Sequence, residues 1–383
     1  MINPNLIWLL LVPVVLGLCL WLALRKQEGT WIVGGAFAGI GMLVVLVVFF
    51  GFKAGATVDV EIWNGQITGK QRLHGTYEQP YSCNCTSHTS CSGSGSNRSC
   101  TTTQSCQTCY ETHYTVHWNA KSTLGEYTID SKDSTWRKVY QSPDPLRWLQ
   151  INPGDPVAQR HTYTNYVQAV PESLFKPSSA QLKAKFANMV PPYPDTIFDF
   201  YRINRFFSPG LSVADSALWN NDIGMMLREL GPRKQVNAIV VIAKTDDPDY
   251  EYALRDGWEG VNKNDVVLLI GAKDYPKIDF VRVISWTKNE LFKIELRDNV
   301  QALETVQREP IMALFQAQIS KNFERRRMRE FAYLESEIDP PVWAIVTLIV
   351  LLMIAAAGTY YVVGKNLGLF RSAPGRTNYQ RRF

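Results

Sequence analysis

Residues 342–363 read VWAIVTLIVLLMIAAAGTYYVV, a stretch without a charged side chain. A helix needs about 20 consecutive apolar residues to cross a hydrocarbon core of roughly 30 Å, so this stretch predicts a transmembrane helix. Residues 364–383 follow it and contain Lys365 and four arginines but no acidic residue. Because basic residues next to a span favour the cytoplasmic side, we expect this tail to be cytoplasmic.

Two more apolar runs, residues 6–24 and 31–52, lie near the beginning of the chain. The six residues between them leave room only for a turn, so the two runs predict a helical hairpin and three transmembrane helices in all. The turn holds Arg25 and Lys26 and is expected in the cytoplasm. Together with the basic tail, it places the N-terminus and the long segment between the spans on the non-cytoplasmic side, which is the periplasm in a bacterial host.

The second run carries Gly35 and Gly39, which are spaced to lie on one face of a helix. Such small-x-x-x-small pairs let another helix approach closely. Packing within the hairpin is the simpler use of the two glycines. A homo-oligomer formed through the N-terminal hairpin is the alternative.

Composition indicates packed cores rather than disorder, since 46% of the residues are hydrophobic and 20% are charged. The formal net charge is +5, and five positive charges lie in the C-terminal tail, so the rest of the chain is close to neutral. Proteins that bind nucleic acid carry a basic patch or stripe. We therefore expect no nucleic-acid partner. The membrane is the expected partner because of the three predicted spans.

Residues 53–141 are expected to form a β-rich module. Val58, Val60 and Ile62 alternate with polar neighbours, and residues 110–118 alternate in the same way. This period of two is typical of half-buried strands. The stretch between them is rich in Ser, Thr and Gly and has almost no apolar residue, so it needs covalent or metal cross-links to be ordered.

That stretch contains six cysteines, which are Cys83, Cys85, Cys91, Cys100, Cys106 and Cys109. On a non-cytoplasmic face, six cysteines fit three disulfides, with fifteen ways of pairing them. The spacing Cys106-x-x-Cys109 leaves two alternatives open. One is a zinc site completed by His88 or His113, and the other is redox chemistry at the two thiols.

Residues 142–205 contain nine prolines between positions 143 and 194. Proline removes a backbone donor and breaks helices. We therefore expect a turn-rich connection that holds one short helix.

Residues 206–335 alternate helix and strand patterns and predict an α/β domain, so that the ectodomain as a whole is α+β. A first helix is expected to stop at Gly231 and Pro232. Runs of Val, Leu and Ile at residues 236–243 and 265–271 predict buried strands. A long helix beyond Gln301 is expected to run toward the last span.

This order of elements resembles the TPM domain over about a third of the chain, residues 206–335. The resemblance is carried by a strand that ends in an acidic loop, a helix with Trp258-Glu-Gly260, a strand of the type Asp265-Val-Val-Leu-Leu-Ile and a long helix before a span. It implies an α/β/α sandwich on a non-cytoplasmic face, with a C-terminal anchor. It also implies the phosphatase activity and calcium binding attributed to some members, although Asn264 and Asp265 stand where the family tends to have a glycine-containing turn.

The acidic loop is the best candidate for a site. Asp246, Asp247 and Asp249 follow the strand at residues 236–243, at the edge where open α/β sheets bind their ligands. Their carboxylates could hold Ca²⁺ or Mg²⁺. In the alternative interpretation Asp247 caps a helix and its neighbours are solvated. Since no nucleophile elbow, P-loop, His-Glu-x-x-His or EF-hand pattern occurs, no catalytic residue is assigned.

The sequence is thus most consistent with a membrane-anchored ectodomain that binds or scaffolds other membrane or envelope proteins. A metal-dependent phosphatase or hydrolase of the TPM type is the main alternative. A second alternative is an accessory subunit of a transporter or channel. Three spans without an intramembrane charge argue against a transport pathway.

Overall fold

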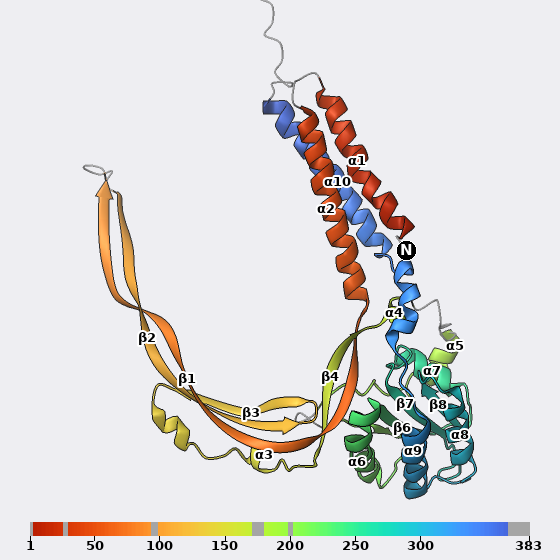
Figure 1. Ribbon diagram of the computed structural model, residues 1–383. Helices are drawn as coiled ribbons and strands as arrows, with labels where there is room; N and C mark the ends of the chain where they lie inside the picture. Colours follow the sequence, from red (N-terminus) through yellow and green to blue (C-terminus); the bar gives the residue numbers. More distant parts are fainter. Residues whose placement is uncertain (1–2, 26–29, 93–98, 171–179, 198–201, 367–383) are drawn as a thin grey trace, which may run out of the picture. The chain divides into compact units, whose positions relative to one another are not determined.

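The structure is a computed structural model that describes residues 3–25, 30–92, 99–170, 180–197 and 202–366. The chain divides into two compact units, which we describe one at a time (Figure 1). Unit 1 comprises residues 1–60, 162–176 and 327–383. Unit 2 comprises residues 61–161 and 177–326. Lys26 and residues 367–383 of the basic tail lie outside the described residues.

Unit 1 contains three helices that are long and apolar enough to cross a membrane, as the sequence predicts. They are α1 (Pro4–Leu24), α2 (Thr30–Ala56) and α10 (Val342–Asn366). Each begins or ends within a few residues of its predicted bounds. Leu9 of α1, Phe49 of α2 and Leu352 of α10 are buried in one shared apolar cluster, so the three helices form a bundle.

The α1–α2 hairpin is packed through glycines other than the predicted two. A Cβ added at Gly17 would lie 2.5 Å from the carbonyl oxygen of Gly34, and one at Gly41 would lie 2.5 Å from Cβ of Pro13. A Cβ at Gly35 or Gly39 would meet no described atom within 4 Å. The prediction that Gly35 and Gly39 pack the hairpin was therefore wrong, because they lie on the other side of α2.

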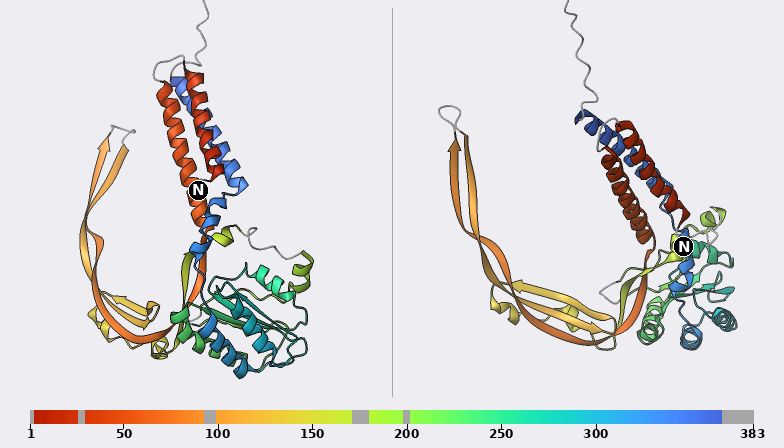
Figure 2. Two further views of the ribbon diagram at one scale, coloured as in Figure 1. Left: turned by 45° about the vertical axis from the view of Figure 1, so that its right-hand side comes forward. Right: turned by 45° about the horizontal axis from the view of Figure 1, so that its top comes forward.

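Polar contacts join the helices at one end of the bundle. The side-chain amides of Asn3 and Asn5 donate to Asp339, at 2.7 and 2.6 Å, and Lys53 pairs with Glu335 at 3.2 Å. Asp339 and Glu335 belong to the segment that precedes α10, which includes the 3₁₀ helix η4 (Met328–Glu337). The C-terminal ends of α1 and α10 lie at the opposite end of the bundle (Figures 1 and 2), so Arg25 and Lys365, which belong to these ends, lie on the same side.

The first sheet has the order β3-β2-β1-β4. Its strands are β1 (Val58–Ser92), β2 (Ser99–Ser122), β3 (Gly125–Ser134) and β4 (Pro156–Thr164). Strand β4 lies in the segment that we expected to be a turn-rich connection. Buried Trp118 and Val116 pack beneath Val139 of the 3₁₀ helix η2 (Arg137–Gln141), and Ile67 packs with Val157. Three of the four strands lie within residues 53–141, where the sequence predicts strands, and β4 lies outside them.

The second sheet has the order β5-β6-β7-β8. Its strands are β5 (Phe206–Phe207), β6 (Asn237–Ala243), β7 (Asp265–Gly271) and β8 (Phe280–Ser285), and only β8 runs antiparallel to its neighbour. Every residue of β6 and β7 is buried, because helices cover both faces.

One face packs on α6 (Ser216–Lys234), α8 (Glu290–Gln301) and α9 (Arg308–Asn322). The other packs on α7 (Tyr250–Gly257) and α5 (Ala180–Phe186), the short helix expected in the proline-rich segment. The predicted mixed α/β content is therefore present, in three layers.

Two helix ends differ from the predictions. Helix α6 continues through Gly231 and Pro232 to Lys234 and ends where Gln235 adopts a left-handed conformation, φ 52°. Pro232 lies in the last turn of α6. Gly231 has no side chain, so the backbone of Asn64 can approach it closely. Helix α9 ends at Asn322 and does not run to the last span, because Arg325 forms a β-bridge with Thr287.

Candidate functional site

The hairpin of β1 and β2 extends well beyond the rest of its sheet. Strand β3 pairs with β2 only from Tyr114 onward. Residues 77–92 and 99–113 therefore form a two-stranded ribbon to which no third described strand is hydrogen-bonded. We call these residues the arm; it is the long hairpin in orange in Figure 1.

The arm has no apolar core. Among its residues with described side chains none is buried, and only Cys83, Cys109, Thr112 and His113 are half-buried. A two-stranded hairpin is marginally stable in water when it stands alone. The order of this ribbon must therefore come from cross-links between its two strands.

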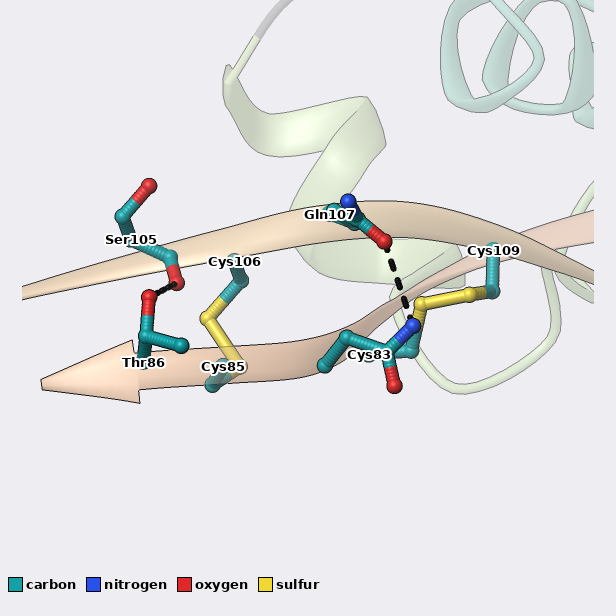
Figure 3. Close-up of a disulfide and its surroundings, with 8 residues drawn as sticks. Cys83, Cys85, Thr86, Ser105, Cys106, Gln107 and Cys109 are labelled. Atoms are coloured by element: carbon teal, nitrogen blue, oxygen red, sulfur yellow. Dashed lines mark hydrogen bonds between the residues drawn. A yellow bond between two sulfur atoms is a disulfide. The ribbon is translucent and has the colours of Figure 1, made fainter.

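Cysteines supply these cross-links. Three disulfides join β1 to β2: Cys83 pairs with Cys109 and Cys85 with Cys106, as Figure 3 shows, and Cys91 pairs with Cys100. The expected disulfides are thus present as three cysteine pairs at bonding distance. Cys106 and Cys109 bond to β1 and not to each other, and the sulfurs that a zinc site would use are occupied.

A β-bulge sets this pairing. The register shifts between Cys83 and Thr86, so that Asn84 and Cys85 on β1 lie opposite the single residue Cys106 on β2. Asn84 has φ 48°, and its side-chain amide donates to Oε1 of Gln107 at 3.1 Å. The extra residue brings both Cys83 and Cys85 next to a cysteine of β2, which strict alternation of side chains would not allow.

The base of the arm is held by a polar contact across three strands. His113 of β2 hydrogen-bonds Oδ1 of Asp133 of β3 through Nδ1 at 2.5 Å, and its ring stacks on Tyr77 of β1. The hydrogen bond from His113 lowers the pKa of Asp133, and the hydrogen bond between Asp133 and Tyr77 raises the pKa of Tyr77. His113, a candidate zinc ligand from the sequence, is thus directed at a carboxylate.

The acidic loop lies where it was predicted, after the C-terminal end of β6, and lysines neutralise it. Asp246 pairs with Lys273 at 2.8 Å, and Asp247 pairs with Lys185 of α5. These lysine contacts lower the pKa values of both carboxyl groups. Asp249 is the N-cap residue of α7, where we expected Asp247; Oδ1 of Asp247 instead accepts the backbone N–H of Asp249 at 2.9 Å.

Within the described ranges, no group of three or more His, Cys, Asp or Glu side chains is arranged to hold a metal ion. Asp265 lies at the N-terminal end of β7, away from the acidic loop, which follows the C-terminal end of the neighbouring strand. Asp256, another acidic residue that could have served as a cation ligand, pairs with Lys183 at 2.6 Å. A cation at Asp246, Asp247 and Asp249 would have to displace Lys185 and Lys273, whose charges already balance two of the three carboxylates.

The opposite edge of the second sheet holds a buried polar network that the sequence analysis missed. Asn237, at the start of β6, donates to Oδ1 of Asp265 at 2.9 Å and accepts a hydrogen bond from Nε of buried Arg205 at 3.1 Å. Tyr193 and the backbone N–H of Asn262 donate to Oδ2 of Asp265, both at 2.8 Å. Burial raises the pKa of Asp265 to about 6 and lowers that of Arg205 to about 10.

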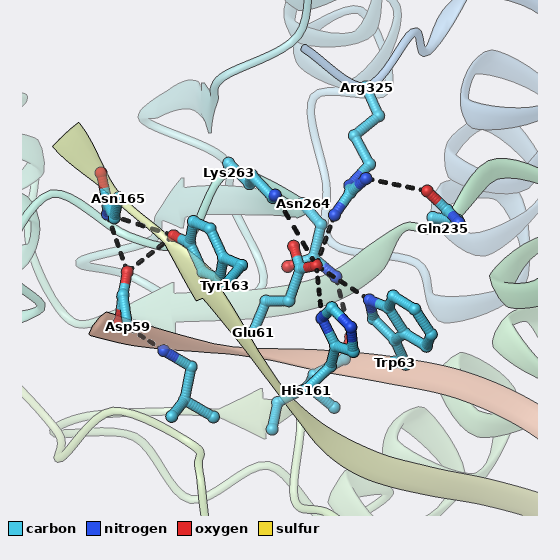
Figure 4. A network of polar contacts seen from close by, with 12 residues as sticks. Asp59, Glu61, Trp63, His161, Tyr163, Asn165, Gln235, Lys263, Asn264 and Arg325 are labelled. Carbon is cyan, nitrogen blue, oxygen red and sulfur yellow. Dashed lines mark hydrogen bonds and ion pairs between the residues drawn. The ribbon is translucent and has the colours of Figure 1, made fainter. Parts of the chain in front are cut away.

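Next to this network, Glu61 of β1 is fully buried, and four donor side chains converge on one of its oxygens (Figure 4). Its Oε1 accepts a hydrogen bond from Trp63 at 2.9 Å and pairs with Arg325, while His161 and Lys263 approach it at 3.3 and 3.8 Å. A buried carboxylate needs such partners, because an unpaired buried charge is strongly destabilising.

Two amides extend this attachment of β1. Asn264 donates to the carbonyl oxygen of Ile62 at 2.8 Å, and Asn64 donates to that of Val236 at 3.0 Å. Residues 61–64 are thereby hydrogen-bonded to the N-terminal edge of the second sheet. This network gives the strand that leads into the arm a fixed attachment within unit 2.

In unit 1, Asp59 forms a separate group, also drawn in Figure 4. Its Oδ2 accepts hydrogen bonds from the hydroxyl of Tyr163 at 2.6 Å and from the side-chain amide of Asn165 at 2.7 Å. These contacts join the start of β1 to the end of β4.

No protein-family model, curated protein or solved structure matches the chain. The functional assignment therefore depends on the geometry alone. Of the two sites that the sequence indicated, the acidic loop is ion-paired within its own unit, whereas the cysteine-rich stretch forms an exposed arm. The arm is the candidate functional site.

Proposed function

We propose that this protein is a membrane-anchored binding or scaffolding protein, whose ectodomain lies on the non-cytoplasmic side and contacts other membrane or envelope proteins through the arm. The observation that carries the proposal is a ribbon without a core that is braced by three disulfides. At about 3.3 Å per residue, the β1 part of the arm, residues 77–92, is roughly 50 Å long. Because the cross-links order a ribbon that has no core, they keep it extended and rigid.

Rigidity favours binding. A flexible segment loses conformational freedom when it meets a partner, and a pre-organised one loses little. The cross-links at Cys91–Cys100 and Cys85–Cys106 hold the distal strands before any partner arrives. The arm therefore presents its backbone and its Ser and Thr hydroxyls in a fixed geometry.

The proposed orientation has two supports. Disulfides persist in oxidising compartments and are rare in the cytosol. Arg25, which caps α1, and Lys365, in the last turn of α10, lie at the same end of the bundle, and basic flanks favour the cytoplasm. Both arguments support the proposal that the arm lies outside the cytoplasm.

The three-layer architecture and the C-terminal apolar helix are also what the TPM resemblance implies, so a TPM-type phosphatase is the second candidate. The lysine partners of Asp246 and Asp247 favour binding over metal-dependent hydrolysis. Asn substitutions of Asp246, Asp247 and Asp249 in the full-length protein distinguish the two. A phosphatase should lose its activity, whereas a binding protein should retain its cross-linking partners.

Site-specific photo-crosslinking in native membranes tests the proposal directly. A photoreactive residue replaces Thr102, which is exposed on the arm, and in a matched protein it replaces Leu291, which is 56% exposed on α8. We expect one dominant protein adduct from position 102 and none from position 291. Equal adducts from both positions, or none from either, would refute the arm as a binding element.

A further inference from the structure

The outer edge of β2 in the arm is an unpaired strand edge. β3 covers this strand from Tyr114 onward, and no described strand continues that pairing toward Cys100. One backbone edge of residues 100–111 therefore has hydrogen-bonding groups that no neighbouring strand satisfies. Such an edge is a template for another strand.

This edge lacks the features that normally protect it. Natural proteins guard exposed edges with charges, prolines, bulges or very short strands. Residues 99–109 read SCTTTQSCQTC and contain no charged residue and no proline, in a chain in which 20% of the residues are charged. The first charge along the strand is Glu111, near the base of the arm.

The neighbouring strand is protected. The bulge lies on β1, where Asn84 and Cys85 oppose one residue of β2, and Asn84 departs from strand geometry with φ 48°. A bulge bends its own strand and disrupts its outer edge. β2 keeps regular alternation from Cys100 to Cys109, so only one of the two edges of the arm is prepared for pairing.

We propose that the edge of β2 at residues 100–109 pairs with the same edge of a second copy of this protein, which makes the arm a homodimerisation element. This inference depends on the proposed binding role of the arm. A two-fold axis brings identical edges together in antiparallel order. Because the edge has no charge, self-pairing places no like charges opposite one another.

The arm already shows the contacts that self-pairing would repeat. Thr89 and Thr102 share a hydrogen bond between their hydroxyls across the ladder at 3.1 Å, and the hydroxyl of Thr86 donates to the carbonyl oxygen of Ser105 at 3.4 Å. A second β2 edge offers the same Ser, Thr and Gln side chains. Tethering both copies in one membrane raises their effective concentration, so modest hydrogen bonds suffice.

The test measures self-association of the full-length chain in lipid vesicles, by energy transfer between donor- and acceptor-tagged copies. Thr101→Lys with Thr108→Lys places one charge near each end of the edge, and when residues 100–109 of two copies pair antiparallel, position 101 of one copy lies opposite position 108 of the other. The matched control, Ser90→Lys with Ser82→Lys, places the same charges on their cross-strand partners on the bulged strand. Peptide mapping without reductant verifies that the three cross-links remain in each variant.

We expect the β2 lysine variant to associate about tenfold more weakly, because like charges oppose each other in the dimer, and the β1 control to associate as the unmodified protein does. Mixing the lysine variant with Thr101→Glu, Thr108→Glu copies should restore association, because each lysine then lies opposite a glutamate. This rescue is specific to self-pairing, since a different partner protein would not gain from the mixture.

Three outcomes would overturn the inference. The first is undiminished association of the lysine variant, and the second is weakened association that the mixture fails to restore. The third is association through the spans: a Gly35→Leu, Gly39→Leu protein loses self-association, whereas charges placed on the arm have no effect on it. In each case, an adduct from Thr102 to a different protein leaves the proposed binding function standing. Absence of any adduct removes both proposals.

Discussion

Asp265 gives the sharpest test of the structure, because its carboxyl group is buried at the start of β7 with its pKa raised by burial to about 6 from an ordinary 3.8. Both the folded and the unfolded protein hold the proton well below pH 4. Between about pH 4 and 6 the unfolded chain releases the proton more readily than the folded protein does. This group therefore lowers the free energy of unfolding as the pH rises through that window.

The magnitude follows from the shift. A pKa raised by about two units corresponds to a loss of about 3 kcal/mol in the free energy of unfolding between pH 4 and 7.5. Asp265→Asn removes the titration. It also loses one hydrogen bond, because an amide has one acceptor oxygen for the three donors Asn237, Asn262 and Tyr193. That loss costs about 1 kcal/mol at every pH, so only the pH dependence of the difference identifies the buried acid.

Guanidinium unfolding of the full-length protein in detergent is followed by tryptophan fluorescence, to which buried Trp219 and Trp258 contribute, and gives the free energy of unfolding by linear extrapolation. The variant should be about 3 kcal/mol more destabilised relative to the unmodified protein at pH 4 than at pH 7.5. Asp274→Asn, at an exposed carboxylate, controls for the loss of one charge. A difference that does not change with pH would show that Asp265 ionises in the folded protein as it does in the unfolded chain.

Three further predictions concern topology, cross-links and the acidic loop. A membrane-impermeant thiol reagent should label Ser134→Cys in intact cells and miss Ser372→Cys, a position outside the described residues; the reverse pattern would contradict the proposed orientation. Mass spectrometry without reductant should find six fewer hydrogens than in the reduced chain, whereas free thiols with bound zinc would support the metal interpretation. Asp247→Ala should lower the free energy of unfolding by about 1 kcal/mol, as when a capping side chain is removed. Asp246→Asn and Asp249→Asn should leave both stability and binding unchanged. Loss of binding in either variant, with the fold intact, would make the loop a functional site.

Local pattern was sufficient for the elements whose environment is uniform along the chain. The three apolar helices were predicted because membrane insertion depends on the length and polarity of one continuous segment. The buried strands β6 and β7 were predicted because a strand covered on both faces is apolar throughout. Six cysteines in a stretch without apolar residues likewise indicated cross-links, although not which cysteines bond.

Tertiary structure alone decided the contacts between distant residues. The disulfide pairing depends on a bulge that places Asn84 out of register. Glu61 meets Arg325 from 264 positions away, and Lys185 meets Asp247 from a segment that the sequence marked only as a connection. Periodicity reports how each segment is buried, whereas the partner of a charge depends on which segments the fold brings together. For that reason the sequence indicated the acidic loop as a candidate cation site, and the structure shows Asp246 and Asp247 paired with lysines.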